Sequence, residues 1–177
     1  MKFGKLTFTK AYEKPELLPT VVLDAIKANN LDASVSEINP NFSDTAAFCE
    51  AYDISPDESA NCVIIEAKRG DKIWYAACMV LATKRADVNG VIRKYLDARK
   101  TSFAPMDVAV NLTGMEYGGI NPIGLPADWP IIVDTRVKEL DDVLIGSGLR
   151  KSKLLVSGNT LASLPNAVVL DIVKETV

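Results

Sequence analysis

The residues best placed to do chemistry lie in one glycine-rich stretch, residues 113–126, in which four of fourteen residues are glycine. Glycine has no Cβ, so its backbone reaches positive φ and allows a ligand to touch the main chain. Successive amides in such a loop can converge on an anion or on a developing oxyanion. Pro122 would stiffen the loop and restrict Asn121 before it. The stretch predicts a ligand pocket, and the alternative is a tight loop whose glycines only serve turns.

Other catalytic arrangements are restricted by composition. The stretch lacks the Gly-Lys-Ser/Thr of a P-loop and the strand and helix context of a dinucleotide fingerprint. The chain has no histidine, which removes Ser–His and Cys–His nucleophile pairs and His-containing zinc sites. The three cysteines lack metal-binding spacing and are expected to be structural reduced thiols, as in a reducing cytoplasm. We therefore expect no metal and no cofactor, and any catalysis must use lysine, carboxylates, hydroxyls, backbone amides or the substrate.

Length and charge are those of one ordinary globular domain. The chain has 177 residues, nearly half of them hydrophobic, and a net charge of −3, which predicts a single domain over residues 1–177. The longest apolar stretch, residues 73–82, is shorter than the roughly 20 residues of a membrane helix. We expect a cytoplasmic protein with neither a membrane nor DNA as partner. Basic residues cluster at Lys84-Arg85, Arg93-Lys94, Arg99-Lys100 and Arg150-Lys151-Lys153; these clusters could meet phosphates or simply be solvated.

Hydrophobic periodicity and turn residues predict interleaved helices and strands. Helices are expected at residues 15–28, at 43–51 with Ser43 as cap, at 87–96 with Asp87 as cap, at 106–113 and at 157–164. Strands are expected at residues 33–38, 62–65, 73–81, 131–133, 143–145, 154–156 and 167–173. The second and third of these strands predict a hairpin, and the apolar run of residues 73–81 predicts burial on both faces. Without strict alternation of helix and strand, the pattern favours an α+β fold with a mixed or antiparallel sheet.

The glycine-rich stretch resembles a motif of the YbaK/ProX family of aminoacyl-tRNA deacylases, which is similar to the editing domain of bacterial prolyl-tRNA synthetase. That motif has Thr-Gly, then Gly-Gly-hydrophobic-Ser/Thr-Pro-hydrophobic-Gly. The positions that match it are Thr113-Gly114, Gly118-Gly119-Ile120, Pro122 and Gly124, with Asn121 where a small hydroxyl residue is usual. A hydrophobic strand ending in Asp134, the turn Gly146-Ser147-Gly148 and the strand at residues 62–65 also match. The resemblance covers roughly residues 46–169 and implies a barrel-like sheet surrounded by helices.

The resemblance implies hydrolysis of the ester that joins a wrong amino acid to tRNA, such as alanine or cysteine on tRNA(Pro). Backbone amides of the glycine loop would polarise the aminoacyl carbonyl, and a ribose hydroxyl of the substrate would help water to attack. The partners implied are the acceptor end of a mischarged tRNA and an aminoacyl-tRNA synthetase. The residues implied in catalysis are Asn61, Gly118 and Gly119; those implied in substrate binding are Cys62, Thr113, Ile120, Asn121, Pro122, Gly124, Asp134, Gly146 and Gly148.

The sequence departs from the family at Asn61. Many members carry a lysine there, followed by a small hydroxyl residue, whereas this chain has Asn61 and Cys62. Lys68 cannot easily replace that lysine, because it lies roughly 23 Å further along the strand and on the opposite face. Asparagine still donates and accepts hydrogen bonds but carries no charge. A backbone-driven deacylase, an inactive binder of amino acid or charged tRNA, and a protein-interaction module all stay open.

Four of the implied site positions have plain structural alternatives. Asp134 follows a strand and could cap a helical turn over residues 135–140 rather than face a pocket. Gly146 and Gly148 could line the pocket or only turn the chain. Asn61 could be a strand-start residue without a chemical role.

Overall fold

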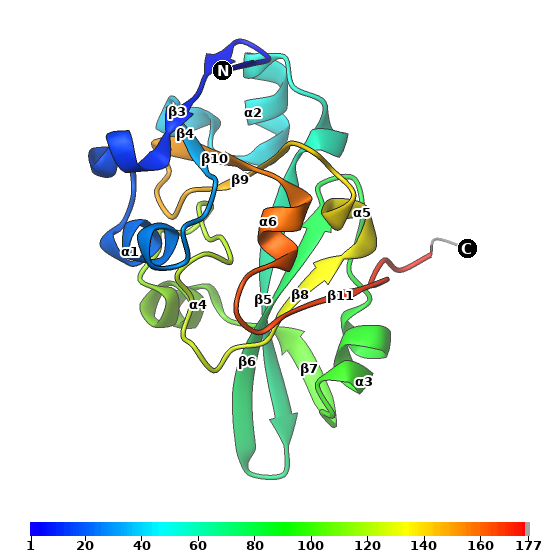
Figure 1. Cartoon of the computed structure of the whole chain (residues 1–177). Coiled ribbons are helices and arrows are strands. Elements are labelled where there is room, and N and C mark those ends of the chain that lie inside the picture. The colour runs from blue at the N-terminus through cyan, green and yellow to red at the C-terminus, as the bar shows by residue number, and fades with distance from the viewer. Residues whose placement is uncertain (176–177) are drawn as a thin grey trace.

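The computed structural model describes residues 1–175 (Figure 1). The strands are β1 (Lys2–Phe3), β2 (Leu6–Thr7), β3 (Thr9–Lys10), β4 (Ser34–Glu37), β5 (Ala60–Arg69), β6 (Lys72–Leu81), β7 (Lys100–Phe103), β8 (Ile131–Asp134), β9 (Val143–Gly146), β10 (Ser152–Val156) and β11 (Ala167–Leu170). The helices are α1 (Thr20–Ala28), α2 (Thr45–Tyr52), α3 (Arg93–Tyr95), α4 (Met106–Thr113), α5 (Thr135–Lys138) and α6 (Gly158–Ala162). A π-helical turn (Val88–Ile92) precedes α3, and 3-10 turns cover Ala11–Glu13, Pro15–Leu17, Pro40–Phe42 and Pro56–Glu58.

The strands form two main sheets, which confirms the α+β class. A five-stranded sheet has the order β11-β8-β6-β5-β7, and a four-stranded sheet has the order β3-β4-β10-β9. The first is mixed, because β8 runs parallel to both β6 and β11 while the other pairs are antiparallel. An isolated bridge joins Ser59 to Leu144 at the junction of the two sheets. The sheets do not close into the expected barrel-like form, since β7 and β11 remain as edges of the larger sheet.

The hairpin of β5 and β6 is the backbone of the larger sheet and was predicted from sequence. Its register pairs Asn61 with Val80 and Lys68 with Ile73, and its tip extends beyond the rest of the sheet (Figure 1). Residues 76–81 are all buried, which confirms the expected burial on both faces for this part of the strand, whereas Ile73 near the hairpin tip is 54% exposed. The hairpin therefore holds Asn61 and Cys62 rigidly at the end where the two sheets meet.

Two differences from the predicted elements have local causes, and a third arises from strand pairing. The expected helix over residues 15–28 is interrupted, because Leu18 is extended before Pro19 and α1 begins only at Thr20. Asp44, not Ser43, caps α2 by accepting hydrogen bonds from the amides of Ala46 and Ala47. Strand β7 was not predicted; it is short and pairs along one edge of β5.

The helices of the described chain are short. Among residues 1–175, none is long and apolar enough to cross a membrane.

Candidate functional site

A cavity of about 350 Å³ lies where the two sheets meet. Its walls come from α2 and the residues before it, from the start of β5, from the loop at residues 117–120, and from β9 and β10. Of the predicted site residues, those in its lining are Asn61, Cys62, Gly118, Ile120 and Gly146. The remaining lining residues are Ser43, Asp44, Thr45, Phe48, Ser59, Ala60, Tyr117, Leu144, Arg150 and Lys153. Segments distant in sequence thus surround one space.

The glycine loop enters the cavity through a tight turn. The amide of Gly119 donates to the carbonyl of Glu116 at 3.0 Å, and Gly118 inside the turn has φ +82°. Such a conformation favours glycine because a Cβ is strained at positive φ. The Gly119 amide is therefore already occupied. The amides of Gly118 and Ile120 make no hydrogen bond within the part of the chain that the structure describes, so they are the loop donors left for a ligand.

The loop is fastened to the turn that follows β9. The amide of Gly148 donates to the carbonyl of Gly119 at 2.6 Å, and the amide of Glu116 donates to the carbonyl of Gly148 at 2.8 Å. At Gly146 an added Cβ would overlap the carbonyl of Gly119. The matching glycine turns of the sequence thus lie against each other, and their lack of side chains permits this close approach of two backbones.

Four predicted binding residues lie inside or behind the loop rather than in the cavity lining. The hydroxyl of Thr113 donates to the carbonyl of Ala109 at 2.7 Å. The side-chain oxygen of Asn121, which is fully buried, accepts from the amide of Ile123 at 2.7 Å. The other two are Pro122 and Gly124, which belong to the same segment. The structure places all four where they set the course of the loop, and direct binding by them stays a prediction.

Gly124 illustrates this supporting position. It has φ +90°, and a Cβ there would lie 2.5 Å from the carbonyl oxygen of Val21 in α1. Gly148, with φ +98°, similarly packs on Pro19. Gly124 thus allows the loop to approach α1, and Gly148 allows the turn after β9 to approach Pro19, so both positions are explained by packing.

We predict that Gly124→Ala lowers the free energy of unfolding by about 3 kcal/mol, through backbone strain and overpacking against α1. Urea denaturation measures this. Gly114→Ala is the control, because Gly114 also has positive φ (+69°) but its added Cβ would meet only a side-chain atom of Val21 at 3.9 Å. An equal loss in both variants would contradict the packing explanation.

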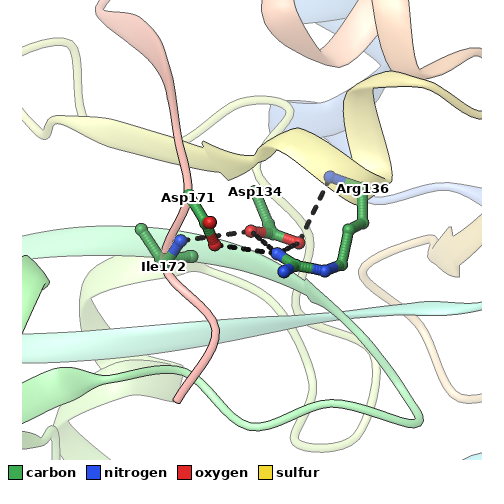
Figure 2. Close-up of polar contacts among 4 residues, drawn as sticks. All are labelled: Asp134, Arg136, Asp171 and Ile172. Atoms are coloured by element: carbon green, nitrogen blue, oxygen red, sulfur yellow. Dashed lines mark hydrogen bonds and ion pairs between the residues drawn. The ribbon is translucent and has the colours of Figure 1, made fainter. Parts of the chain in front are cut away.

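Asp134 lies outside the cavity lining and forms a structural polar cluster (Figure 2). The carboxylate is fully buried and caps α5 by accepting a hydrogen bond from the amide of Arg136. It also accepts from the amide of Ile172 at 3.1 Å and pairs with the Arg136 guanidinium at 3.2 Å. The guanidinium in turn contacts Asp171 at 2.8 Å. This geometry is that of the helix cap that the sequence analysis gave as the alternative. A ligand-binding role for Asp134 stays a prediction.

Asn61 and Cys62 enter the cavity from the first residues of β5. The side-chain oxygen of Asn61 accepts a hydrogen bond from the Thr45 hydroxyl at 3.0 Å, which ties β5 to the start of α2. Burial raises the pKa of the Cys62 thiol, and the neighbouring Cys78 raises it further. A protonated thiol is a poor nucleophile, so Cys62 acts as a wall of the cavity rather than as an attacking group.

Sequence reasoning did not single out Ser43 or Lys153 as cavity residues. Lys153 appeared only as part of a basic cluster, yet it is 8% exposed and lies opposite Gly146 in the pairing of β10 with β9. Arg150 of the same basic cluster also lines the cavity. The other predicted basic pairs do not line it: Lys100, for example, pairs with Lys68, seven residues along β5 from Asn61 and thus roughly 23 Å away. The sequence did contain one signal for Lys153: it belongs to a mostly apolar strand. A lysine on a buried strand needs a polar cavity or partner for its ammonium group.

Comparison with known proteins identifies the family of this fold. Residues 39–164 match the family described as the aminoacyl-tRNA editing domain. A proline–tRNA ligase of Listeria monocytogenes serovar 1/2a is 31% identical over 70 residues. That match covers 39% of this chain and 12% of the ligase, so the chain corresponds to a small part of that enzyme.

Two crystal structures share the fold over most of their length. One is of a protein suggested to be a trans-editing enzyme for prolyl tRNA synthetase, with a TM-score of 0.75 and 17% identity, over 88% of this chain and 96% of the other. The second is of hypothetical protein APE2540, with a TM-score of 0.77 and 23% identity, over 87% and 99%. At these identities the likeness concerns the fold alone. With the family match extending over most of its residues, the chain belongs to the family of aminoacyl-tRNA editing domains.

Proposed function

We propose that the protein is a trans-editing deacylase, which hydrolyses the ester of a tRNA carrying a wrong amino acid. The observation that supports this is the cavity, in which Gly118, Ile120 and Gly146 of the glycine motifs meet Asn61 of the strand start. The relatives connected with prolyl-tRNA synthesis favour tRNA(Pro) charged with a small amino acid such as alanine or cysteine. The place of action would be the cytoplasm, with an aminoacyl-tRNA synthetase as a second partner.

The chemistry would be addition of water to the ester carbonyl. The free amides of Gly118 and Ile120 would donate to the carbonyl oxygen as it becomes negative, a preorganised stabilisation that needs no histidine. Asn61 would orient the substrate by hydrogen bonding. The ester C–O bond would then break, and the ribose oxygen would leave with a proton drawn from the water through the neighbouring ribose hydroxyl. The products would be a free amino acid and uncharged tRNA.

The test is to incubate the protein with tRNA(Pro) charged with alanine, cysteine or serine and to follow loss of the ester. We expect loss above the buffer rate for at least one of these substrates, and no loss for tRNA(Pro) charged with proline, the matched control. Absence of hydrolysis across these substrates and a wider panel of charged tRNAs would refute the deacylase.

A second candidate is a binder of amino acid or charged tRNA without turnover, and the uncharged Asn61 favours it. It predicts a rise in melting temperature on adding charged tRNA, while the ester stays intact. Asn61→Lys separates the two candidates further. A gain of hydrolysis in this variant over an inactive parent would identify a decayed active site.

A further inference from the structure

The end of the cavity at β10 contains a buried cation that the proposed reaction does not yet use. The ammonium of Lys153 donates to the carbonyl of Ser43 at 3.3 Å and lies 5.2 Å from the ring centroid of Phe48. Within residues 1–175, no carboxylate comes within ion-pair distance of it. An ammonium has three donors, so Lys153 has hydrogen-bonding capacity to spare beside the cavity.

A second group at the same end is also incompletely bonded. The hydroxyl of Ser43 is buried, with the residue 3% exposed, and has no hydrogen-bond partner in the described chain. Buried hydroxyls nearly always have partners. A ligand that fills the cavity would supply the missing one, since Ser43 belongs to the cavity lining.

Gly118 and Arg150 adjoin these groups. A Cβ at Gly118 would lie 3.1 Å from a terminal guanidinium nitrogen of Arg150 and 3.8 Å from the Ser43 hydroxyl. The guanidinium donates to the carbonyls of Tyr117 and Pro40, at 3.3 and 3.4 Å, and forms no ion pair in the part of the chain that the structure covers. Three side-chain donors therefore lie at this end of the cavity: an ammonium, a guanidinium and a hydroxyl.

Two cations, Lys153 and Arg150, lie at this end of the cavity. Burial lowers the pKa of Lys153 and the nearby Arg150 lowers it further, whereas Cys49 and Asp44 act in the opposite direction. Two carboxylates are nearby, and both accept hydrogen bonds from backbone amides: Asp44 at the start of α2, and Glu116 from the amide of Arg150 at 3.0 Å. Two cations held together in this way are stabilised when an anionic ligand binds between them.

We propose that Lys153, Arg150 and Ser43 bind a phosphodiester group, the one that joins the terminal adenosine of tRNA to the preceding nucleotide. This assignment rests on the proposed function, since it places the end of a tRNA in the cavity. A phosphodiester offers several acceptor oxygens and a negative charge, which suit a guanidinium fork beside a point-charge ammonium. Lys153 thereby contributes, from another strand, a positive charge that Asn61 lacks.

Isothermal titration with the dinucleotide CpA and with adenosine tests the site. CpA carries the phosphodiester and adenosine does not. We expect the intact protein to bind CpA at least about 10-fold more tightly than adenosine, as charge-assisted hydrogen bonds would give. Lys153→Met should remove that difference and leave adenosine binding unchanged. Lys138→Met is the matched control, because Lys138 is exposed on α5 and does not line the cavity.

Equal binding of CpA and adenosine by the intact protein would overturn the proposal, as would equal effects of Lys153→Met and Lys138→Met. Inorganic phosphate that binds as tightly as CpA would overturn it too, in favour of a general anion site.

Ser43→Ala removes one hydroxyl with little risk to folding, and weaker CpA binding in this variant would support the site if Lys153→Met fails to fold. Unchanged CpA binding in Ser43→Ala would count against it. These titrations measure binding and not ester hydrolysis. A protein that binds CpA as expected but hydrolyses no ester would therefore contradict the proposed deacylase and leave the phosphodiester site intact.

Discussion

Asp134→Ala is expected to lower the free energy of unfolding by about 3 kcal/mol, measured by urea denaturation. The carboxylate is fully buried and serves three partners, as Figure 2 shows. Its loss leaves α5 uncapped, which costs about 1 kcal/mol. It also leaves the buried amide of Ile172 unpaired, which costs about 1–3 kcal/mol. The Arg136 guanidinium can turn to solvent, so the broken ion pair adds little.

Asp171→Ala is the matched control, because it removes the other carboxylate that pairs with the same guanidinium. Asp171 is 67% exposed at its side chain, so we expect only a small loss of stability. The Arg136 guanidinium lowers the pKa of Asp171 below its ordinary value. The stabilisation is therefore present above the unfolded pKa and disappears as the pH falls through the folded value. Equal losses at neutral pH for Asp134→Ala and Asp171→Ala would contradict the importance of the cap and the Ile172 amide.

Elements fixed by local signals were predicted well from the sequence. The hairpin β5–β6 follows from two β-branched or apolar runs separated by a polar turn, and α4 follows from its periodicity with Gly114 at the end in the left-handed conformation. Asp87 caps the turn before α3 as expected. These features depend on neighbouring residues, which a single sequence displays. The break at Pro19 was just as local, since the residue before a proline avoids helical conformation, and it could have been predicted.

The composition of the cavity could be predicted only in part, because it depends on pairings between distant segments. The glycine motifs identified Gly118, Ile120 and Gly146, but no local signal places Lys153 beside Ser43, which lies 110 residues away along the chain. That contact results from the pairing of β10 with β9 and β4 and from the packing of α2. The occupied amide of Gly119 was equally hidden, since it results from the turn geometry at Gly118.

Gly118→Ala is expected to lower kcat/KM for the edited ester by about 100-fold, the size of effect that follows loss of one stabilising donor. The added methyl would stand 3.1 Å from Arg150 and 3.8 Å from Ser43, in the space where the donors converge. It would also strain a residue with φ +82°, which tends to turn the Gly118 amide away. Single-turnover hydrolysis, together with CpA titration, measures both consequences. We expect CpA binding to weaken as well.

Gly70→Ala isolates the cost of strain from the effect on the cavity. Gly70 has φ +59° in the hairpin turn, and a Cβ there would meet nothing within 4 Å. Both variants should lose about 1–2 kcal/mol of stability through positive φ, but only Gly118→Ala should lose hydrolysis. Comparable hydrolysis by the two variants would mean that ligands do not approach the loop at Gly118. Glycine at position 118 would then be explained by the turn alone, because the turn between Glu116 and Gly119 requires a positive φ there.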